Sequence, residues 1–299
     1  MSNGSLQPRP TKNQKREEAR EKARALREEQ AKRDKRRRLF WQLGAIVGTL
    51  AVVSAVFFGY QSWQQGEIKA SAGPANMLSD GLVVTPQGPV LTEGIPAGGT
   101  PVPTVVDPSG SAVNVTVYYD YLCPFCGQFE TTNGAYLQQL VQNGATVEMH
   151  PIAILTSNSS GTRYSERAAN AFACVANTEP EVALAFNALL FANQPAEGTA
   201  GLTDDELKGF AAQAGATQTE AIDACIDSKE FKNWVQAATL RATTGPIPNS
   251  SLAKVTGTPT ILVNGKQYTG SLTDPNEFKA FVVQASAETS ATATPTPAP

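Results

Sequence analysis

The sequence is poor in the residues from which most catalytic and metal centres are built. It has a single histidine, His150, and only four cysteines among its 299 residues. A structural zinc site needs four such ligands, and Cys-x-x-Cys occurs once, at Cys123 and Cys126. No cofactor-binding motif is present. We therefore expect neither a metal nor a cofactor, and we expect His150, inside a predicted strand at 146–155, to be structural.

Basic residues are scarce after residue 38, and they outnumber acidic residues before it. Residues 1–38 contain 14 Lys/Arg and 6 Asp/Glu, a balance of +8, whereas the rest contains 10 and 21, a balance of −11. Residues 11–38 have few apolar side chains for a core, so they form either a charged helix near anionic lipid headgroups or a solvated tail. We expect no nucleic-acid partner, because an adjacent apolar run already accounts for the basic segment.

That apolar run, residues 39–60, contains no charged residue and is long enough to span a bilayer. Trp41 at one end, and Tyr60 and Trp63 at the other, are typical of membrane interfaces. The basic residues before it place the N-terminus in the cytoplasm and the chain after residue 60 outside. A cleaved signal peptide is the alternative, because Ala70-Ser71-Ala72 fits the A-x-A pattern. The basic and apolar segments are both long for a signal peptide, so we expect an uncleaved anchor in the cell membrane.

Cys123-Pro124-Phe125-Cys126 lies where a predicted strand meets a predicted helix. Residues 113–119 are rich in β-branched and aromatic residues, and apolar residues then recur at helical spacing up to Asn143-Gly144. At a helix N-terminus the unpaired N–H groups and the helix dipole favour a thiolate, the form that attacks disulfides. Pro124 suits the first helical turn. A structural disulfide is the alternative, but so short a loop removes little chain entropy, and we predict a redox-active pair.

A second motif supports this interpretation. Gly257-Thr258-Pro259-Thr260 precedes a predicted strand, and Asn264-Gly265 predicts a type I′ hairpin turn. A strand-initiating proline would account for the motif by itself. Together with Tyr119-Asp120-Tyr121-Leu122-Cys123-Pro124-Phe125-Cys126, however, it resembles the DsbA-like thioredoxin-fold oxidoreductases, over about residues 76–286. The resemblance implies a cis Thr258–Pro259 bond beside the cysteines, with Thr258 and Pro259 holding the backbone of a peptide substrate.

The chain departs from many members of that family between the two cysteines. They carry a histidine whose charge helps to stabilise the thiolate, whereas this chain has Phe125. Pro124 and Phe125 are therefore candidates for redox tuning, and the helix N-terminus must stabilise the thiolate to a larger extent. Asp120 is a weaker candidate. It would tune proton transfer at Cys126 if it were buried nearby, and it would otherwise be a solvated residue at the end of a strand.

The other two cysteines, Cys174 and Cys225, lie in predicted helices at 164–177 and 219–228. A disulfide between them would close a 52-residue loop, worth about 4 kcal/mol in the chain-entropy model. The alternative is two buried free thiols. We favour the disulfide, because the segment is expected outside the membrane. Membrane-anchored, actinobacterial members of the resembled family often carry an extra cysteine pair in this region, which points the same way.

The order of predicted elements is strand, active-site helix, strand, helical block, hairpin and helix. This is an α/β protein, a thioredoxin fold with an inserted α-helical domain, preceded by one transmembrane helix. The start of the domain is open, since residues 81–84 and 89–91 are predicted as short edge strands within a Gly/Pro-rich segment. The expected parts are a basic cytoplasmic segment (1–38), a transmembrane helix (39–60), a linker (61–75), a DsbA-like thioredoxin domain (76–286, with its helical insertion at about 160–245) and a disordered Thr/Pro/Ala tail (287–299).

These patterns predict an extracytoplasmic thiol:disulfide oxidoreductase that introduces disulfides into exported proteins. A substrate thiolate would attack Cys123 to give a mixed disulfide, and Cys126 would be the resolving cysteine. The family resemblance implies a quinone-linked membrane partner that reoxidises the pair. Two alternatives stay open at this point: the same site working as a reductase or isomerase, and a non-catalytic peptide-binding module with an incidental disulfide.

Overall fold

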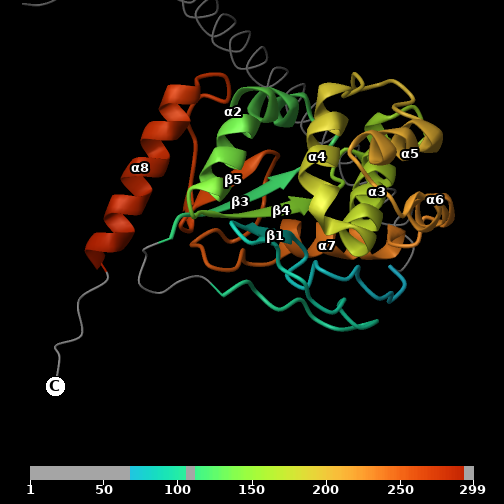
Figure 1. Ribbon diagram of the computed structural model, residues 1–299, viewed down its shortest axis with the longest axis horizontal. Helices are drawn as coiled ribbons and strands as arrows, with labels where there is room; N and C mark the ends of the chain where they lie inside the picture. The colour runs from blue at the N-terminus through green and yellow to red at the C-terminus, as the bar shows by residue number, and fades with distance from the viewer. Residues whose placement is uncertain (1–67, 106–111, 293–299) are drawn as a thin grey trace, which may run out of the picture. The chain divides into compact units, whose positions relative to one another are not determined.

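A mixed sheet of six strands forms the centre of the computed structural model, which describes residues 68–105 and 112–292 (Figure 1). The strand order is β2-β1-β4-β3-β5-β6, in which β3 and β4 are parallel and all other neighbours are antiparallel. The strands are β1 (Leu82–Thr85), β2 (Gly88–Pro89), β3 (Asn114–Tyr119), β4 (Thr146–Pro151), β5 (Thr260–Val263) and β6 (Lys266–Gln267).

Helix α2 (Pro124–Gln142) connects the two parallel strands and covers one face of the sheet (Figure 1). A parallel pair needs such a crossover, whereas an antiparallel pair can be joined by a tight turn. The α2 side chains Phe129, Leu137 and Val141 are buried in the same core as Val117 and other side chains of the sheet. The helix ends at the predicted Asn143-Gly144. Gly144 has φ +103°, a backbone conformation that favours glycine.

The opposite face of the sheet carries a smaller core that includes His150. Tyr118 and Leu262 pack there with residues that follow the helical insertion, such as Ile247 and Val255. His150 is buried, lies 3.2 Å from Glu148 through Nε2–Oε1, and stacks on Tyr118 with ring centroids 4.3 Å apart. These contacts are structural, as the sequence predicts for His150.

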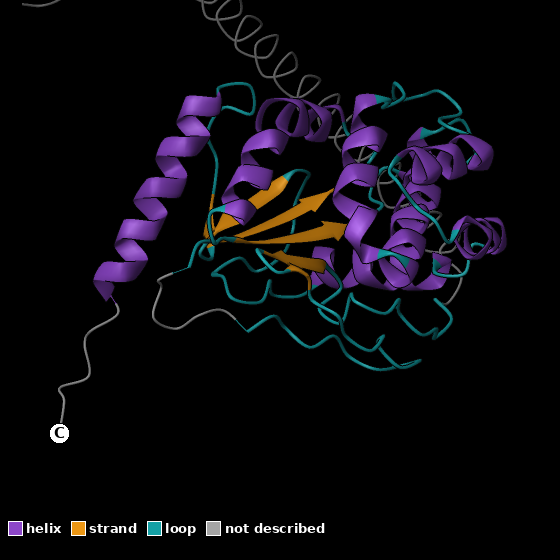
Figure 2. Ribbon diagram, in the orientation of Figure 1, coloured by secondary structure: helices purple, strands orange, loops and turns teal. Residues whose placement is uncertain are grey.

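Between β4 and β5 the chain forms a block of helices that gathers at one end of the sheet (Figure 2). This block corresponds to the predicted insertion. It contains α3 (Tyr164–Thr178), α4 (Ala183–Ala192), α5 (Asp204–Gln213), α6 (Thr219–Ser228) and α7 (Lys232–Thr244), with short 3-10 turns at Thr156–Asn158 and Pro180–Val182. Helix α3 is its centre, since its alanines allow neighbouring helices to approach closely and all but three of its 15 residues are buried.

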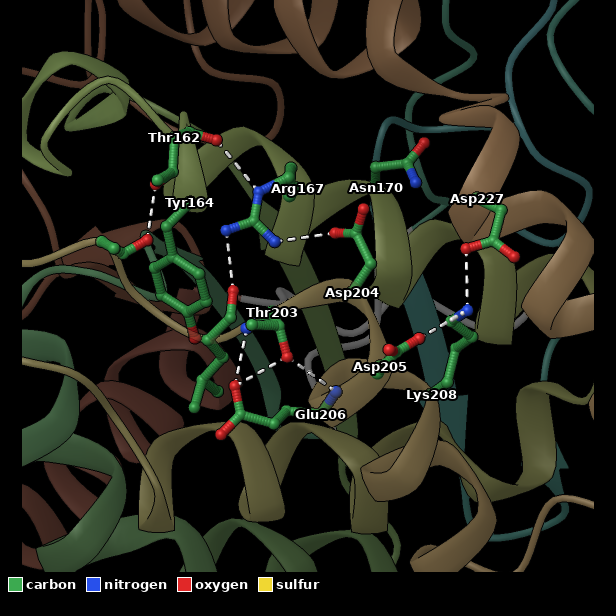
Figure 3. Close-up of polar contacts among 12 residues, drawn as sticks. Thr162, Tyr164, Arg167, Asn170, Thr203, Asp204, Asp205, Glu206, Lys208 and Asp227 are labelled. Carbon is green, nitrogen blue, oxygen red and sulfur yellow. Dashed lines mark hydrogen bonds and ion pairs between the residues drawn. The ribbon is translucent and has the colours of Figure 1, made fainter.

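Polar contacts fix the loop before α5 against α3 (Figure 3). The Thr203 hydroxyl accepts a hydrogen bond from the Glu206 backbone N–H, and the Glu206 carboxylate accepts one from the Thr203 backbone N–H, which is a capping box. Arg167 donates to the Leu202 carbonyl at 2.7 Å and pairs with Asp204 at 2.7 Å. The two capping-box bonds satisfy backbone N–H groups that a helix start would otherwise leave unpaired.

The predicted borders of the domain need correction at both ends. Ala75, assigned to the linker, donates its N–H to Asn177 Oδ1 at 2.9 Å, so the chain is already bound to the insertion before residue 76. Of the two predicted edge strands, β1 is internal, between β2 and β4, and only β2 lies at an edge; β6 forms the other edge of the sheet. Helix α8 (Pro275–Thr292) extends beyond the predicted start of the tail at 287, because the Ala-rich sequence continues to favour helix until the prolines near the end.

The predicted basic segment, the transmembrane helix and residues 61–67 of the linker lie outside the described residues. Within residues 68–105 and 112–292 the structure contains no helix with the length and apolar character needed to cross a bilayer.

A disulfide joins Cys174 of α3 to Cys225 of α6, the pairing favoured from the sequence. Their Cα atoms are 5.8 Å apart, and both residues are buried in the core of the insertion. The bond is therefore a structural cross-link between two helices.

Replacing both residues, as Cys174→Ala with Cys225→Ala, is expected to lower the free energy of unfolding by about 4 kcal/mol, because the unfolded chain is no longer closed into a long loop. Urea unfolding monitored by circular dichroism measures this value. The control is Cys123→Ala with Cys126→Ala, which removes only the short-loop pair. Equal stability of the two double variants would contradict the prediction.

Candidate active site

Cys123 is the N-cap residue of α2 and lies directly beyond the turn that follows β3. Its backbone is extended (φ −74°, ψ 115°), and Pro124 occupies the first turn, where no N–H partner is needed. The Cys123 carbonyl accepts hydrogen bonds from the N–H groups of Cys126 at 3.0 Å and Gly127 at 3.2 Å. The sulfur is thus held beside the end of the helix that favours negative charge.

The loop before β5 lies next to this cysteine because β5 pairs with β3. In that antiparallel register Tyr118 lies opposite Thr260, so the residues that precede β5 meet those that follow β3. The Thr258–Pro259 peptide bond is cis, as the family resemblance implies. Cys123 Sγ lies 3.1 Å from the Thr258 carbonyl oxygen, to which the protonated thiol donates a hydrogen bond. Segments separated by more than 130 residues therefore form one site.

Both cysteines are free thiols with opposite acidities. A hydrogen bond from Cys126 is the main cause that lowers the pKa of Cys123 to about 6, with further contributions from Thr258 and from the backbone of Cys126 and Phe125. Burial raises the pKa of Cys126 well above its usual range, and its interaction with Cys123 adds to this effect. Near neutral pH the pair therefore holds one thiolate on Cys123 and one proton on Cys126.

The Thr258 hydroxyl is an additional polar group at this site. It is buried, and within the described residues it makes no hydrogen bond of regular geometry. Polar contact with the Thr258 side chain lowers the pKa of both Cys123 and Cys126. A buried hydroxyl without a bonded partner is costly, so this position favours a negative sulfur nearby.

Pro124 and Phe125 both lie on the exposed side of the site. The Phe125 side chain is 57% exposed and is among the most exposed large apolar side chains of the described residues. It supplies no charge, and its contribution to the acidity of Cys123 comes through its backbone. An apolar surface thus lies next to the reactive sulfur.

Asp120 is fully buried, which excludes the solvated alternative considered for it. Its carboxylate accepts hydrogen bonds from the N–H groups of Leu122 and Leu155, both at 2.9 Å, and from the Ser165 hydroxyl. Burial raises its pKa despite these donors. The turn that carries Cys123 is thus bonded, through the Asp120 side chain, to the segment after β4. Asp120 therefore acts on the cysteines by holding this turn in place.

Two side chains near the site were not identified from the sequence. Glu130 lies one turn after Cys126 on α2, accepts from Asn187 Nδ2 at 3.1 Å, and has its pKa raised by burial to about 7. Its i+4 spacing from Cys126 was an available signal. Gln194, from the loop after α4, donates to the carbonyls of Tyr121 and Cys123. No local pattern predicts a contact across about 70 residues.

Comparison with known proteins gives one family and several related structures. A family model described as Thioredoxin matches residues 107–283. No curated protein sequence matches the chain. Reduced DsbA from Mycobacterium tuberculosis is 28% identical, with a TM-score of 0.50 over 72% of this chain and 100% of that one. MdbA from Actinomyces oris, a thiol-disulfide oxidoreductase, is 20% identical, with a TM-score of 0.51 over 74% of this chain and 97% of that one, and shares the fold.

The acidity of Cys123 can be tested without any substrate. In the reduced protein, the rate of alkylation of Cys123 by iodoacetamide is expected to rise with a midpoint near pH 6, because only the thiolate reacts. Cys126→Ala removes the main hydrogen bond to the sulfur and should move this midpoint upward, whereas Cys126→Ser keeps a donor and should move it less. A wild-type midpoint near about 8.5, the value of an ordinary cysteine, would contradict the prediction.

Proposed function

This chain belongs to the thioredoxin family, as a DsbA-like thiol:disulfide oxidoreductase, and from this premise we propose that it introduces disulfides into exported proteins through Cys123 and Cys126. The observation that supports this direction is the hydrogen-bonded, acidic thiol of Cys123. A stabilised thiolate favours the reduced form of the pair, and a pair that is stable when reduced is a stronger oxidant when it is a disulfide.

In the proposed reaction the Cys123–Cys126 disulfide accepts two electrons from two substrate thiolates. The first thiolate attacks Cys123 Sγ, the bond between the two cysteines breaks, and the Cys126 thiolate leaves and takes up a proton. The high pKa of the buried Cys126 favours this protonation. The second substrate thiolate then attacks the substrate sulfur of the mixed disulfide, releasing Cys123 as a thiolate, which leaves readily because of its low pKa.

Thr258 and Pro259 are proposed to hold the substrate. The Thr258 carbonyl lies at hydrogen-bond distance from the Cys123 sulfur, so an extended peptide bound along this loop would pass beside the reacting atom. Phe125 adds an exposed apolar contact on the same side. Main-chain pairing with an apolar contact suits unfolded proteins of varied sequence.

The proposed location is the outer side of the cell membrane, with residues 39–60 as the anchor. The support is the uncharged 22-residue run and the basic residues before it. Reoxidation of the dithiol is assigned to a membrane partner linked to quinone, as the family resemblance implies.

The direction of the reaction is tested by the reduction potential of the pair, measured by equilibration with glutathione. We expect a value between those of thioredoxin, about −270 mV, and of a strong oxidase, about −120 mV, because the hydrogen bond from Cys126 lowers the pKa of Cys123 and so stabilises the reduced pair. A value at or below that of thioredoxin would favour the reductase alternative.

The catalytic role is tested with reduced, unfolded ribonuclease as substrate. Cys123→Ala is expected to abolish its oxidation, since no sulfur remains for the substrate to attack. The Cys174→Ala, Cys225→Ala variant is the control and should retain the initial rate at low temperature. Oxidation by Cys123→Ala at the wild-type rate would leave only the peptide-binding alternative.

The anchor is tested on the mature protein from membranes of the producing cell. An uncleaved anchor predicts that the full-length mass is recovered from carbonate-washed membranes. Recovery in the soluble fraction of a chain that begins just after Ala72 would instead identify a cleaved signal peptide.

A further inference from the structure

Gln194 is a residue of the helical insertion that reaches the turn of the redox site. It follows α4, and its side-chain Nε2 donates to the carbonyl oxygens of Cys123 at 2.9 Å and Tyr121 at 3.0 Å. The Cys123 carbonyl thus accepts a hydrogen bond from Gln194 in addition to those from the N–H groups of Cys126 and Gly127.

The first turn of α2 is shaped to receive this side chain. A Cβ atom on Gly127 would lie 2.2 Å from Gln194 Oε1, a distance that no real contact allows. The absence of a side chain at residue 127 therefore leaves room for the Gln194 amide beside the first turn of α2. The neighbouring Asn193 is different: it is exposed, and its amide donates only to the Leu189 carbonyl within its own helix.

The bonds of Gln194 act on the peptide groups that determine where the sulfur lies. The carbonyls of Tyr121 and Cys123 flank the backbone from which the Cys123 side chain departs. A shift of these groups would move Sγ relative to the Thr258 carbonyl, now 3.1 Å away, and relative to Cys126. Hydrogen bonds to a sulfur weaken steeply with distance and angle, so small backbone shifts change its reactivity.

We propose that Gln194 is a positioning residue of the redox site, which holds the Cys123 sulfur against Cys126 and Thr258 and so makes its reactivity depend on the docking of the helical insertion. This inference rests on the proposed function only in taking Cys123 as the attacked sulfur. The competing interpretation is that Gln194 merely fastens the insertion to the thioredoxin unit.

The test compares reduced full-length Gln194→Ala with the wild type and with Asn193→Ala as the matched control from the same loop. The readout is the rate of alkylation of Cys123 by iodoacetamide across pH. For Gln194→Ala we expect the midpoint of the alkylation profile to rise by about one pH unit or slightly less. Below pH 6 the alkylation rate should then be lower than that of the wild type by about five- to tenfold. Asn193→Ala should match the wild type.

Urea unfolding of the same proteins separates the two interpretations. If Gln194→Ala lowers the unfolding midpoint but leaves the pH profile of alkylation unchanged, Gln194 is only a fastening residue and the proposal is wrong. This assay requires no substrate and no oxidant. A failure of Cys123 in ribonuclease oxidation would therefore remove the proposed function without deciding the role of Gln194.

Gly127→Ala approaches the same contact from the other side and completes a double-mutant cycle. In the wild-type background the added methyl group displaces Gln194 and should reproduce the slower alkylation. In the Gln194→Ala background no amide remains to be displaced, and the same change should have no further effect on alkylation. Equal effects of Gly127→Ala in the two backgrounds would overturn the proposal, because the methyl group would then act on α2 alone.

Discussion

Hydrogen bonding of β3 to neighbours on both edges is the constraint from which the site follows. The parallel partner, β4, requires the crossover helix whose first turn carries the two cysteines. The antiparallel partner, β5, brings the cis-proline loop to the same end of β3. A shift of the β3–β5 register would separate Cys123 from Thr258, whose side chain contributes to the acidity of the Cys123 thiol.

The two thiols differ in pKa because they differ in burial as well as in hydrogen bonding. Cys126 faces the core, where burial favours the neutral thiol, and it stabilises the charge on Cys123 by donating to it. Asp120 and Glu130 are further buried carboxyls near this turn, and burial raises the pKa of each. The low pKa of Cys123 therefore arises without a basic side chain, and Phe125 between the two cysteines supplies no charge.

The sequence was sufficient for the parts of the fold whose signals are local. Short-range patterns account for the strand before Cys123, the helix after it and the capping box of α5. They also account for the Asn264-Gly265 turn, whose two residues have φ of 48° and 78°. The proximity of Thr258 to Cys123 came only from family resemblance. The burial of Asp120 and the reach of Gln194 could not be predicted, because both depend on partners 35 to 73 residues away whose placement is set by packing of the insertion.

The cross-link between α3 and α6 has a consequence for the life of the protein itself. The loop that it closes lies wholly within the helical insertion, and the same insertion supplies Gln194 to the redox site. A newly made chain must therefore lose two electrons from Cys174 and Cys225 before the insertion gains its full stability. The protein is in this sense a client of the chemistry proposed for it, and a cell that begins to make it needs an oxidant already in place, either another enzyme or earlier copies of the same chain.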